Sequence, residues 1–338
     1  MSGQPTCRAA DMRRRWSRRS DPVRYTAAVP LAVITLEFDP VLRLGDWAVR
    51  WETLAIGGAI FIGLVLAGLL AGRSHVPGTD DDPAGTHLGR DDLLFIALGI
   101  VPGALVGGRL AYVALHLDYY SSHQAALVDA TSGGLALNGA VVLGALSGGL
   151  VARLFDAPIG RWYEIAAVPM LAVLALGKAA NVVGATGQGL PTGLDWATRY
   201  LGPGPWASLG PTIPSYPAQA LEAIAVGLLA IAIALTAALG GFRAHDGRGF
   251  VLALGGWAGV RFAVAGIWRD PVVLGPFRTE QVIDLAIVGL ATVVFVALVL
   301  RARLARRSQP SARGQVSVGP DRDGVSSMID TPPTRGLR

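Results

Sequence analysis

The most regular pattern along this chain is a series of long apolar runs separated by short polar connectors. Seven runs of about 20 residues are each long enough to cross a hydrocarbon core of about 30 Å. They lie at approximately 53–72, 92–116, 134–154, 163–183, 218–239, 249–267 and 282–300. These runs lack the polar stripe at 3.6-residue spacing that helices of soluble proteins carry. The pattern therefore predicts an all-α integral membrane protein with seven transmembrane helices.

Composition points to the same class. Of 338 residues, 52% are hydrophobic and 16% are charged, which leaves too little polar surface for a soluble globule of this size. The 44 glycines suit helices that approach closely inside a membrane. The basic residues are scattered over connectors and both tails, which argues against a nucleic-acid partner. Cys7 is the only cysteine, so neither an intrachain disulfide nor a cysteine metal cluster is possible, and we expect no metal and no cofactor.

Arginines in the connectors predict the orientation of the helices. They follow the first, third, fifth and seventh runs, which places those connectors in the cytoplasm, whereas the connector at 117–133 has no Lys or Arg and should face outside. Seven arginines between residues 8 and 24 conflict with the outside N-terminus that this orientation requires. The block is an overextended start of the reading frame, which we favour, a cytoplasmic leader, or a tail that departs from the rule.

The predicted organisation has three parts. Residues 1–36 form the Arg-rich leader, residues 37–305 form the seven-helix membrane domain, and residues 306–338, rich in Ser, Pro, Gly and Arg, form a disordered cytoplasmic tail.

Polar residues inside the apolar runs are the candidate functional residues, because a charge there costs about 2.5–3.5 kcal/mol on insertion scales. Arg109 lies in GALVGGRLAYVALH, with Tyr112 on the same helical face. Its guanidinium could fork onto a lipid phosphate or extend to the headgroups near the helix end. Asn138 begins the third run, where its amide could donate to an oxyanion or satisfy a freed backbone group.

A second set of polar residues lies in the fourth, fifth and sixth runs. Lys178, the only lysine, shares a face with Asn181, although a cation at a helix C-terminus is an ordinary stabilising feature. Glu222 lies in the first turn of the fifth run, where the helix dipole also favours an acid. Arg261 lies within the sixth run and Arg269 follows it. Several cations with few acids indicate an anionic ligand, most simply a phospholipid headgroup.

Taken in order, several segments resemble the prolipoprotein diacylglyceryl transferase family over residues 36 to 305. They are EFDPVLRLGDWAVRW, GGRLAYV, GGLALNGAVVLG, LALGKAANVVGATGQGLPTG, YPAQALE, GVRF, WRDP and TEQVIDL. The resemblance implies a multi-pass enzyme of the bacterial inner membrane. It would move the diacylglyceryl group of phosphatidylglycerol to the lipobox cysteine thiol in a prolipoprotein signal peptide and release glycerol phosphate.

The resemblance also implies residue roles. Arg109 and Arg261 would hold the phosphate of phosphatidylglycerol and stabilise charge on the leaving phosphate. Asn181 and Gly189 would shape the pocket. Lys178 stands in place of the family's arginine, so it keeps the charge and loses the bidentate geometry.

The chain departs from the family at positions that carry chemistry. The family's His-Gly-Gly motif reads Asn138-Gly139-Ala140, and an asparagine cannot take the proton of a thiol. Further departures are Glu52 for a tyrosine, Thr186 for a glutamate, Tyr216 for a histidine, Leu221 for a tyrosine and Ala265 for an acid. Three readings stay open. The first is a transferase, in which the thiol ionises unaided or gives its proton to His116 or Glu222. The second is a catalytically impaired member that binds phospholipid or lipoprotein precursor without turnover. The third, disfavoured because the helices show no inverted repeat, is a transporter or another membrane protein.

Overall fold

The computed structural model describes residues 33–73, 90–127, 134–155, 158–208, 210–242 and 245–308. The long helices are α2 (Trp51–Arg73), α3 (Arg90–Leu115), α5 (Leu137–Leu154), α6 (Ile159–Gly184), α7 (Ala218–Ala238), α8 (Arg248–Ala265) and α9 (Thr279–Ser308). In this part of the chain six helices are long and apolar enough to cross a membrane, and α8 is not among them. The prediction of a helical membrane protein is confirmed in this form, and the predicted count of seven spans is not reached.

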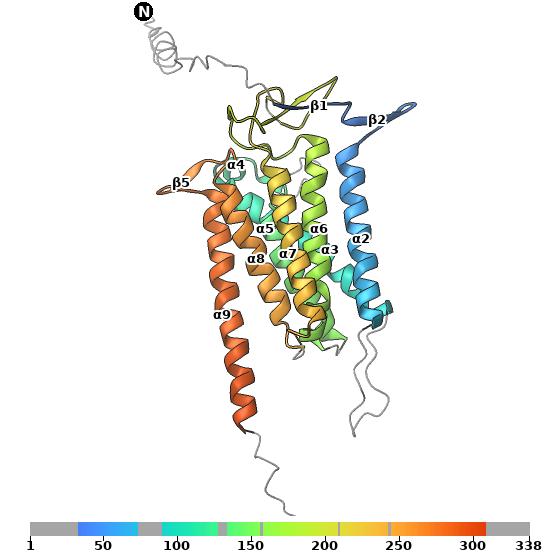
Figure 1. Ribbon diagram of the computed structural model, residues 1–338, viewed down its shortest axis with the longest axis vertical. Helices are drawn as coiled ribbons and strands as arrows, with labels where there is room; N and C mark the ends of the chain where they lie inside the picture. Colours follow the sequence, from blue (N-terminus) through green and yellow to red (C-terminus); the bar gives the residue numbers. More distant parts are fainter. Residues whose placement is uncertain are drawn as a thin grey trace, which may run out of the picture. The chain divides into compact units, whose positions relative to one another are not determined.

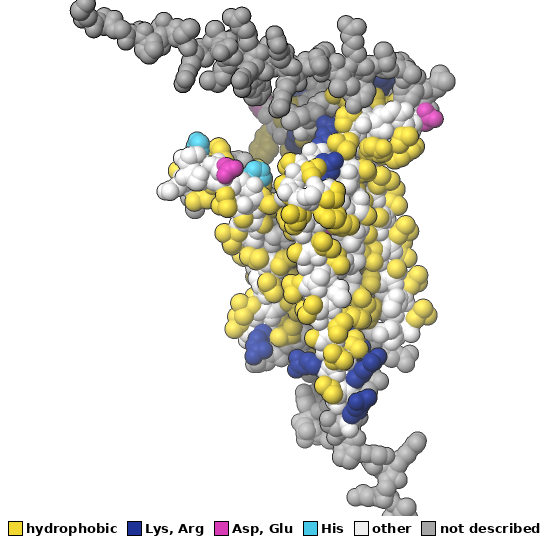
Figure 2. Space-filling view, turned by 90° about the vertical axis from the view of Figure 1, so that its left-hand side faces the viewer, with side chains coloured by type: hydrophobic (Ala, Val, Ile, Leu, Met, Phe, Trp, Pro, Cys, Tyr) yellow, Lys and Arg dark blue, Asp and Glu magenta, His cyan; other side chains and the backbone are white. Residues whose placement is uncertain are grey.

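Small residues line the inner face of α2, and large apolar residues cover its outer face. Ala59, Gly63, Ala67 and Ala71 are buried at four-residue spacing, whereas Phe61 on the opposite side is 67% exposed. Helices in lipid associate through close packing of such small residues. Hydrophobic side chains cover the sides of the helices and Lys and Arg gather near their ends (Figure 2), as expected for a surface that contacts lipid.

The helices pack around α6, which contacts α2, α5, α7 and α8. The core joins α6, α7 and α8 through Leu171, Val226 and Trp257, all with no exposed surface. At the α3–α5 contact a Cβ added to either Gly107 or Gly139 would collide with the backbone carbonyl of the other, so only glycine permits this approach.

Short strands and a short helix lie at one end of the helices (Figure 1), in the connectors that follow α3, α6 and α8 and in the segment before α2. Strand β1 (Ile34–Glu37) pairs in parallel with β4 (Thr198–Leu201). Strands β2 (Val41–Leu44) and β3 (Trp47–Arg50) form a hairpin, as do β5 (Val272–Leu274) and β6 (Phe277–Arg278). Helix α4 (Leu117–Ser122) and the 3-10 helix η1 (Gln124–Leu127) follow α3.

These strands correct the all-α prediction. Each has only two to four residues, which is too short to produce a readable alternation of polar and apolar positions. They form because connector backbone needs hydrogen-bond partners wherever it is shielded from water. Residues 1–32 of the expected leader lie outside the described residues, and Ile34 to Leu36 belong to β1.

Contacts divide the chain into residues 1–296 and 297–338, with the division inside α9. The described part of the second unit, residues 297–308, is the end of that helix and carries Arg301 and Arg303. The expected tail therefore begins within a helix at 306–308, and residues 309–338 lie outside the described residues.

Candidate functional site

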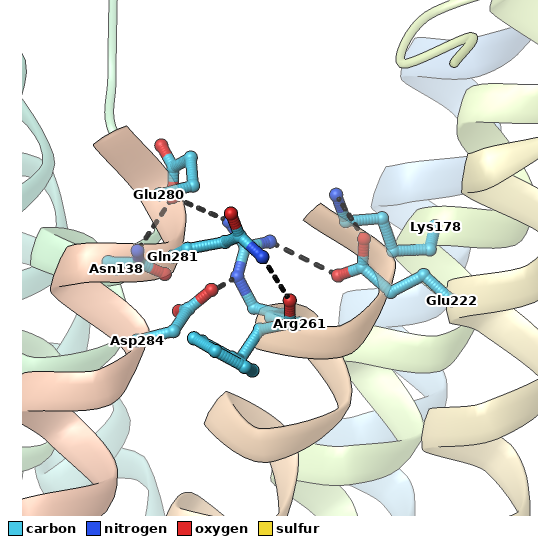
Figure 3. A network of polar contacts seen from close by, with 8 residues as sticks. Asn138, Lys178, Glu222, Arg261, Glu280, Gln281 and Asp284 are labelled. Carbon is cyan, nitrogen blue, oxygen red and sulfur yellow. Dashed lines mark hydrogen bonds and ion pairs between the residues drawn. The ribbon is translucent and has the colours of Figure 1, made fainter. Parts of the chain in front are cut away.

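A buried ionic network joins α6, α7, α8 and α9, with Arg261 at its centre (Figure 3). On α8, Arg261 NH1 lies 3.1 Å from Glu222 Oε1 and NH2 lies 2.8 Å from Glu280 Oε2. Its Nε lies 3.5 Å from Asp284 Oδ1, an ion pair without hydrogen-bond geometry. The side chain of Arg261 is 3% exposed, and those of Glu222 and Asp284 are 0% exposed. Charges this deep must be paired, because unpaired ions are costly to bury.

Lys178 extends the network onto α6. Its Nζ lies 3.0 Å from Glu222 Oε2, so Glu222 binds a different cation through each carboxylate oxygen. The Lys178 ammonium lies 4.5 Å from the ring centre of Trp268, and the Arg261 guanidinium lies 4.7 Å from the same ring. In the described network, two cations face three carboxylates, so the group carries one formal negative charge when all five are ionised.

Asn138 joins the network from α5. Its Nδ2 donates to Glu280 Oε2 over 2.7 Å, while its Oδ1 is buried and accepts no hydrogen bond from the described residues. The start of α5 is fixed here because the N–H of Ala136 donates to the carbonyl of Gly108 on α3 over 2.9 Å. The tight α3–α5 contact therefore decides where the Asn138 amide lies.

The first turn of α9 is held against α8 by Gln281. Its Oε1 accepts from the N–H of Arg278 over 3.0 Å and its Nε2 donates to the carbonyl of Phe262 over 3.2 Å. Arg278 also donates to the carbonyls of Asp270 and Gly266. These bonds link the hairpin β5–β6, the end of α8 and the start of α9.

Asp270, whose carbonyl accepts from Arg278, is half-buried, and its carboxylate is electrostatically unfavourable as an anion. Burial raises the pKa of its carboxyl above 3.8, and the neighbouring Glu280 raises this pKa further. In the connector between α6 and α7, burial raises the pKa of Tyr200 to about 12, against the opposing effect of the hydrogen bond that Tyr200 accepts from Gln219. Tyr200 is therefore a neutral phenol at physiological pH.

Arg109 lies in a different local group from Arg261. Its Nε and NH2 donate to the carbonyls of Leu127 and Ala126 over 3.1 and 2.5 Å, and its NH1 donates to Gly134 over 3.3 Å. Its guanidinium lies 5.4 Å from the ring of Tyr120. Here Arg109 ties the connector after α3 to its own helix, and a role in binding phosphate stays a prediction.

Tyr112, one turn beyond Arg109, lies in this same group. Its ring stacks on the imidazole of His116 with 4.2 Å between centroids and meets Tyr120 edge-on at 6.4 Å. His116 was a candidate base from sequence. It is exposed, and its Nδ1 lies 2.8 Å from the carbonyl of Tyr112. None of the contacts described for the Arg261 network includes His116.

Gly189 and Arg269 form a third group. The Arg269 Nε donates to the carbonyl of Gly189 over 2.7 Å, and its NH2 donates to the hydroxyl of Ser215 over 2.8 Å. A Cβ on Gly189 would collide with the carbonyl of Ile267. Asn181 accepts the N–H of Thr186 through its backbone carbonyl over 2.9 Å. The structure therefore places Lys178 and Asn138 in the network of Arg261, and gives Asn181, Gly189 and Arg269 other partners.

Two of the unusual residues noted from sequence meet one another. The hydroxyl of Thr186 donates to Glu52 Oε1 over 2.6 Å, and Arg50 donates to Glu52 Oε2 over 3.3 Å and to the carbonyl of Gly184 over 3.2 Å. This arrangement joins the start of α2 to the end of α6, and nothing in the sequence pattern indicated it.

Glu280 and Asp284 are the site residues that sequence reasoning missed. They lie one turn apart at the start of α9, with an i, i+4 spacing that places both on one helix face. Two acids with this spacing at the start of an apolar run were the available signal. Among the described residues, no group of three His, Cys, Asp or Glu side chains is placed to hold a metal ion.

Comparison with known proteins gives one family. The model of the prolipoprotein diacylglyceryl transferase family matches residues 40–297. A phosphatidylglycerol–prolipoprotein diacylglyceryl transferase of Nostoc sp. is 27% identical over 292 residues, which cover 85% of this chain and 98% of that protein. The protein of that name from Acaryochloris marina is 27% identical over a match that covers 77% of this chain and 90% of that protein. The one from Symbiobacterium thermophilum is 29% identical over 75% of this chain and 90% of that protein.

Proposed function

The chain belongs to the prolipoprotein diacylglyceryl transferase family, and we propose on that premise that it transfers the diacylglyceryl group of phosphatidylglycerol to a prolipoprotein. The structural observation that carries the proposal is a pair of cations, the largely buried Lys178 and the buried Arg261, inside a bundle of apolar helices. Such a site is suited to a substrate whose charged phosphate and apolar chains enter together.

Several finer features belong to this proposal. Helix α8 is a seventh span, made marginal by its arginines and by a glycine-rich middle. The protein lies in the inner membrane with the strand-bearing end outside, because the opposite ends of α2 and α5 carry Arg73 and Arg153. The acceptor is the lipobox cysteine thiol of the prolipoprotein signal peptide.

The chemistry is a displacement at carbon. The cysteine sulfur attacks the glyceryl carbon bonded to the phosphate oxygen, the carbon–oxygen bond breaks, and glycerol phosphate leaves with the bonding electrons. The phosphate then carries one more negative charge than it had in the lipid. Lys178 and Arg261, fixed by Glu222 and Trp268, are preorganised cations that can stabilise this charge in a site shielded from water.

The test is complementation. The chain is expressed in bacteria depleted of their own transferase, and lipoprotein is analysed for the diacylglyceryl modification. We expect modified lipoprotein from the wild-type chain and its loss in Arg261→Ala and in Arg109→Ala. Absence of modified product from a wild-type chain that inserts normally would contradict the proposal.

One observation favours the alternative of a binding protein without turnover. Arg261 is already neutralised by carboxylates on α7 and α9, so its guanidinium is less able to stabilise the extra charge that a leaving phosphate would gain during turnover. In that case the complementation assay gives no modified lipoprotein, whereas purified protein still retains phosphatidylglycerol.

A further inference from the structure

The proposed transfer needs a group that accepts the thiol proton, and the amide of Asn138 cannot do so. Asn138 instead donates its Nδ2 hydrogen to Glu280 Oε2 over 2.7 Å. The position from which a base would act is therefore in direct contact with a carboxylate that comes from another helix.

Among the three acids around Arg261, Glu280 is the accessible one. Its side chain is 20% exposed, against 0% for Glu222 and for Asp284. Its Oε2 accepts from both Asn138 and Arg261, while its Oε1 makes no hydrogen bond with the described residues. Figure 3 shows Glu280 in the first turn of α9, with this second oxygen directed away from Arg261. One oxygen is thus fixed and the other is open.

A second buried atom also lacks a partner at this place. Asn138 is 3% exposed, and its Oδ1 accepts nothing from the described residues. Buried acceptors are normally satisfied, so an unpaired one in contact with an open carboxylate indicates a site for a donor group from a ligand. A thiol S–H or a hydroxyl of the glycerol headgroup has the required chemistry.

We propose that Glu280 is the proton acceptor in the transfer, held in place by Asn138 and Arg261; the inference rests on the proposed function. The thiol proton passes to Glu280 Oε1 as sulfur bonds to the glyceryl carbon and the carbon–oxygen bond to phosphate breaks. The proton then passes to the departing glycerol phosphate, a monoester with a second pKa of about 6, which restores the carboxylate. Every atom and charge is accounted for without a co-reactant.

The charge of the network explains why the proton acceptor, Glu280, is paired with Arg261. With Glu280 ionised, the two cations are outnumbered by three carboxylates, and an extra phosphate charge meets a negative site. When Glu280 takes the proton, the network becomes neutral and Arg261 NH2 loses its anionic partner. The cation is therefore released at the step in which the phosphate gains its charge, which is when stabilisation accelerates the reaction.

The test is Glu280→Gln in lipid nanodiscs that contain phosphatidylglycerol, assayed with a lipobox peptide over a range of pH. Loss of a positioned base costs about 100-fold or more in kcat near neutral pH. The residual rate should rise with pH towards about 8.5, where the thiol ionises unaided. Retention of phosphatidylglycerol should not fall, because a negative charge has been removed.

Asp284→Asn is the matched control, because it removes the same charge from beside Arg261 at a fully buried position. Its pH profile should keep the wild-type shape. Glu280→Asp should restore part of the rate with the wild-type shape, which covers the case of a poorly folded Gln variant. A Glu280→Gln protein with a wild-type pH profile contradicts the inference alone, whereas an inactive wild-type protein contradicts the proposed function itself.

Discussion

At the scale of single residues, the charged side chains of the ionic network stabilise one another, since each buried charge has a partner of opposite sign. The geometry of Arg261 is the most demanding, because its three nitrogens reach three different acids on two helices. Such networks seldom exceed an apolar packing in stability, but removing one partner leaves the others buried without compensation.

Arg261→Ala should therefore lower the free energy of unfolding by about 3–5 kcal/mol, the usual cost of breaking a buried ion pair from one side. Thermal unfolding of the purified protein in detergent measures this loss. Arg199→Ala is the control, because Arg199 makes an exposed hydrogen bond with Thr35, and it should change stability by no more than about 0.5 kcal/mol. Equal losses of unfolding free energy in the two variants would contradict the prediction that the ionic network stabilises the fold.

Asp270 should make stability depend on pH in the acid range. Since its pKa is raised on folding, the folded state holds the proton more tightly than the unfolded state. The stability that Asp270 contributes is fully present below its unfolded pKa of 3.8, and it is lost as the pH rises through the pKa of Asp270 in the folded state. In Asp270→Asn, the curve of melting temperature against pH should be flatter over this acid range. The wild-type slope in the variant would be evidence against the raised pKa of Asp270.

At the scale of elements, glycines decide how closely α3 and α5 approach. Gly107→Ala would place a methyl group against the carbonyl of Gly139, so the helices must separate and move Asn138 away from Glu280. We expect both a lower melting temperature and a lower rate of diacylglyceryl transfer. Gly57→Ala on α2 is the control, since a Cβ there meets nothing within 4 Å and the change improves helix propensity.

The helices could be predicted from sequence, and most of the network could not. Runs of apolar residues located six of the seven long helices to within a few residues, because spanning a membrane imposes a length, whereas α9 continues eight residues beyond the predicted run at 282–300. The runs contain no information on which helices meet, so the Glu222 contacts with Lys178 and Arg261 followed only from the fold. Glu280 was missed because it precedes the predicted run at 282–300, so it did not count as a polar residue inside an apolar run, although α9 begins at Thr279.

At the scale of the whole molecule, the number of spans fixes which side each connector faces. We propose three single cysteines in a Cys7→Ser background, labelled in intact cells with a maleimide that cannot cross membranes. Ser121→Cys on α4 should react, and Leu239→Cys after α7, where the leucine is 83% exposed, should not. Pro276→Cys in the β5–β6 turn decides the role of α8: labelling there means that α8 crosses the membrane, and protection means that it does not.

The pairing of β1 with β4 also sets an order of assembly during synthesis. Thr35 and Arg199, which are bonded across the two strands, are 164 residues apart in the chain. At a synthesis rate of about 5–20 residues per second, β1 leaves the ribosome roughly 10–30 s before its partner exists. Strand β1 must therefore remain without its partner strand while α2, α3, α5 and α6 are synthesised. The strand-bearing end is a late product of biogenesis, and the corner of Glu52 and Thr186 can form only after α6 has arrived.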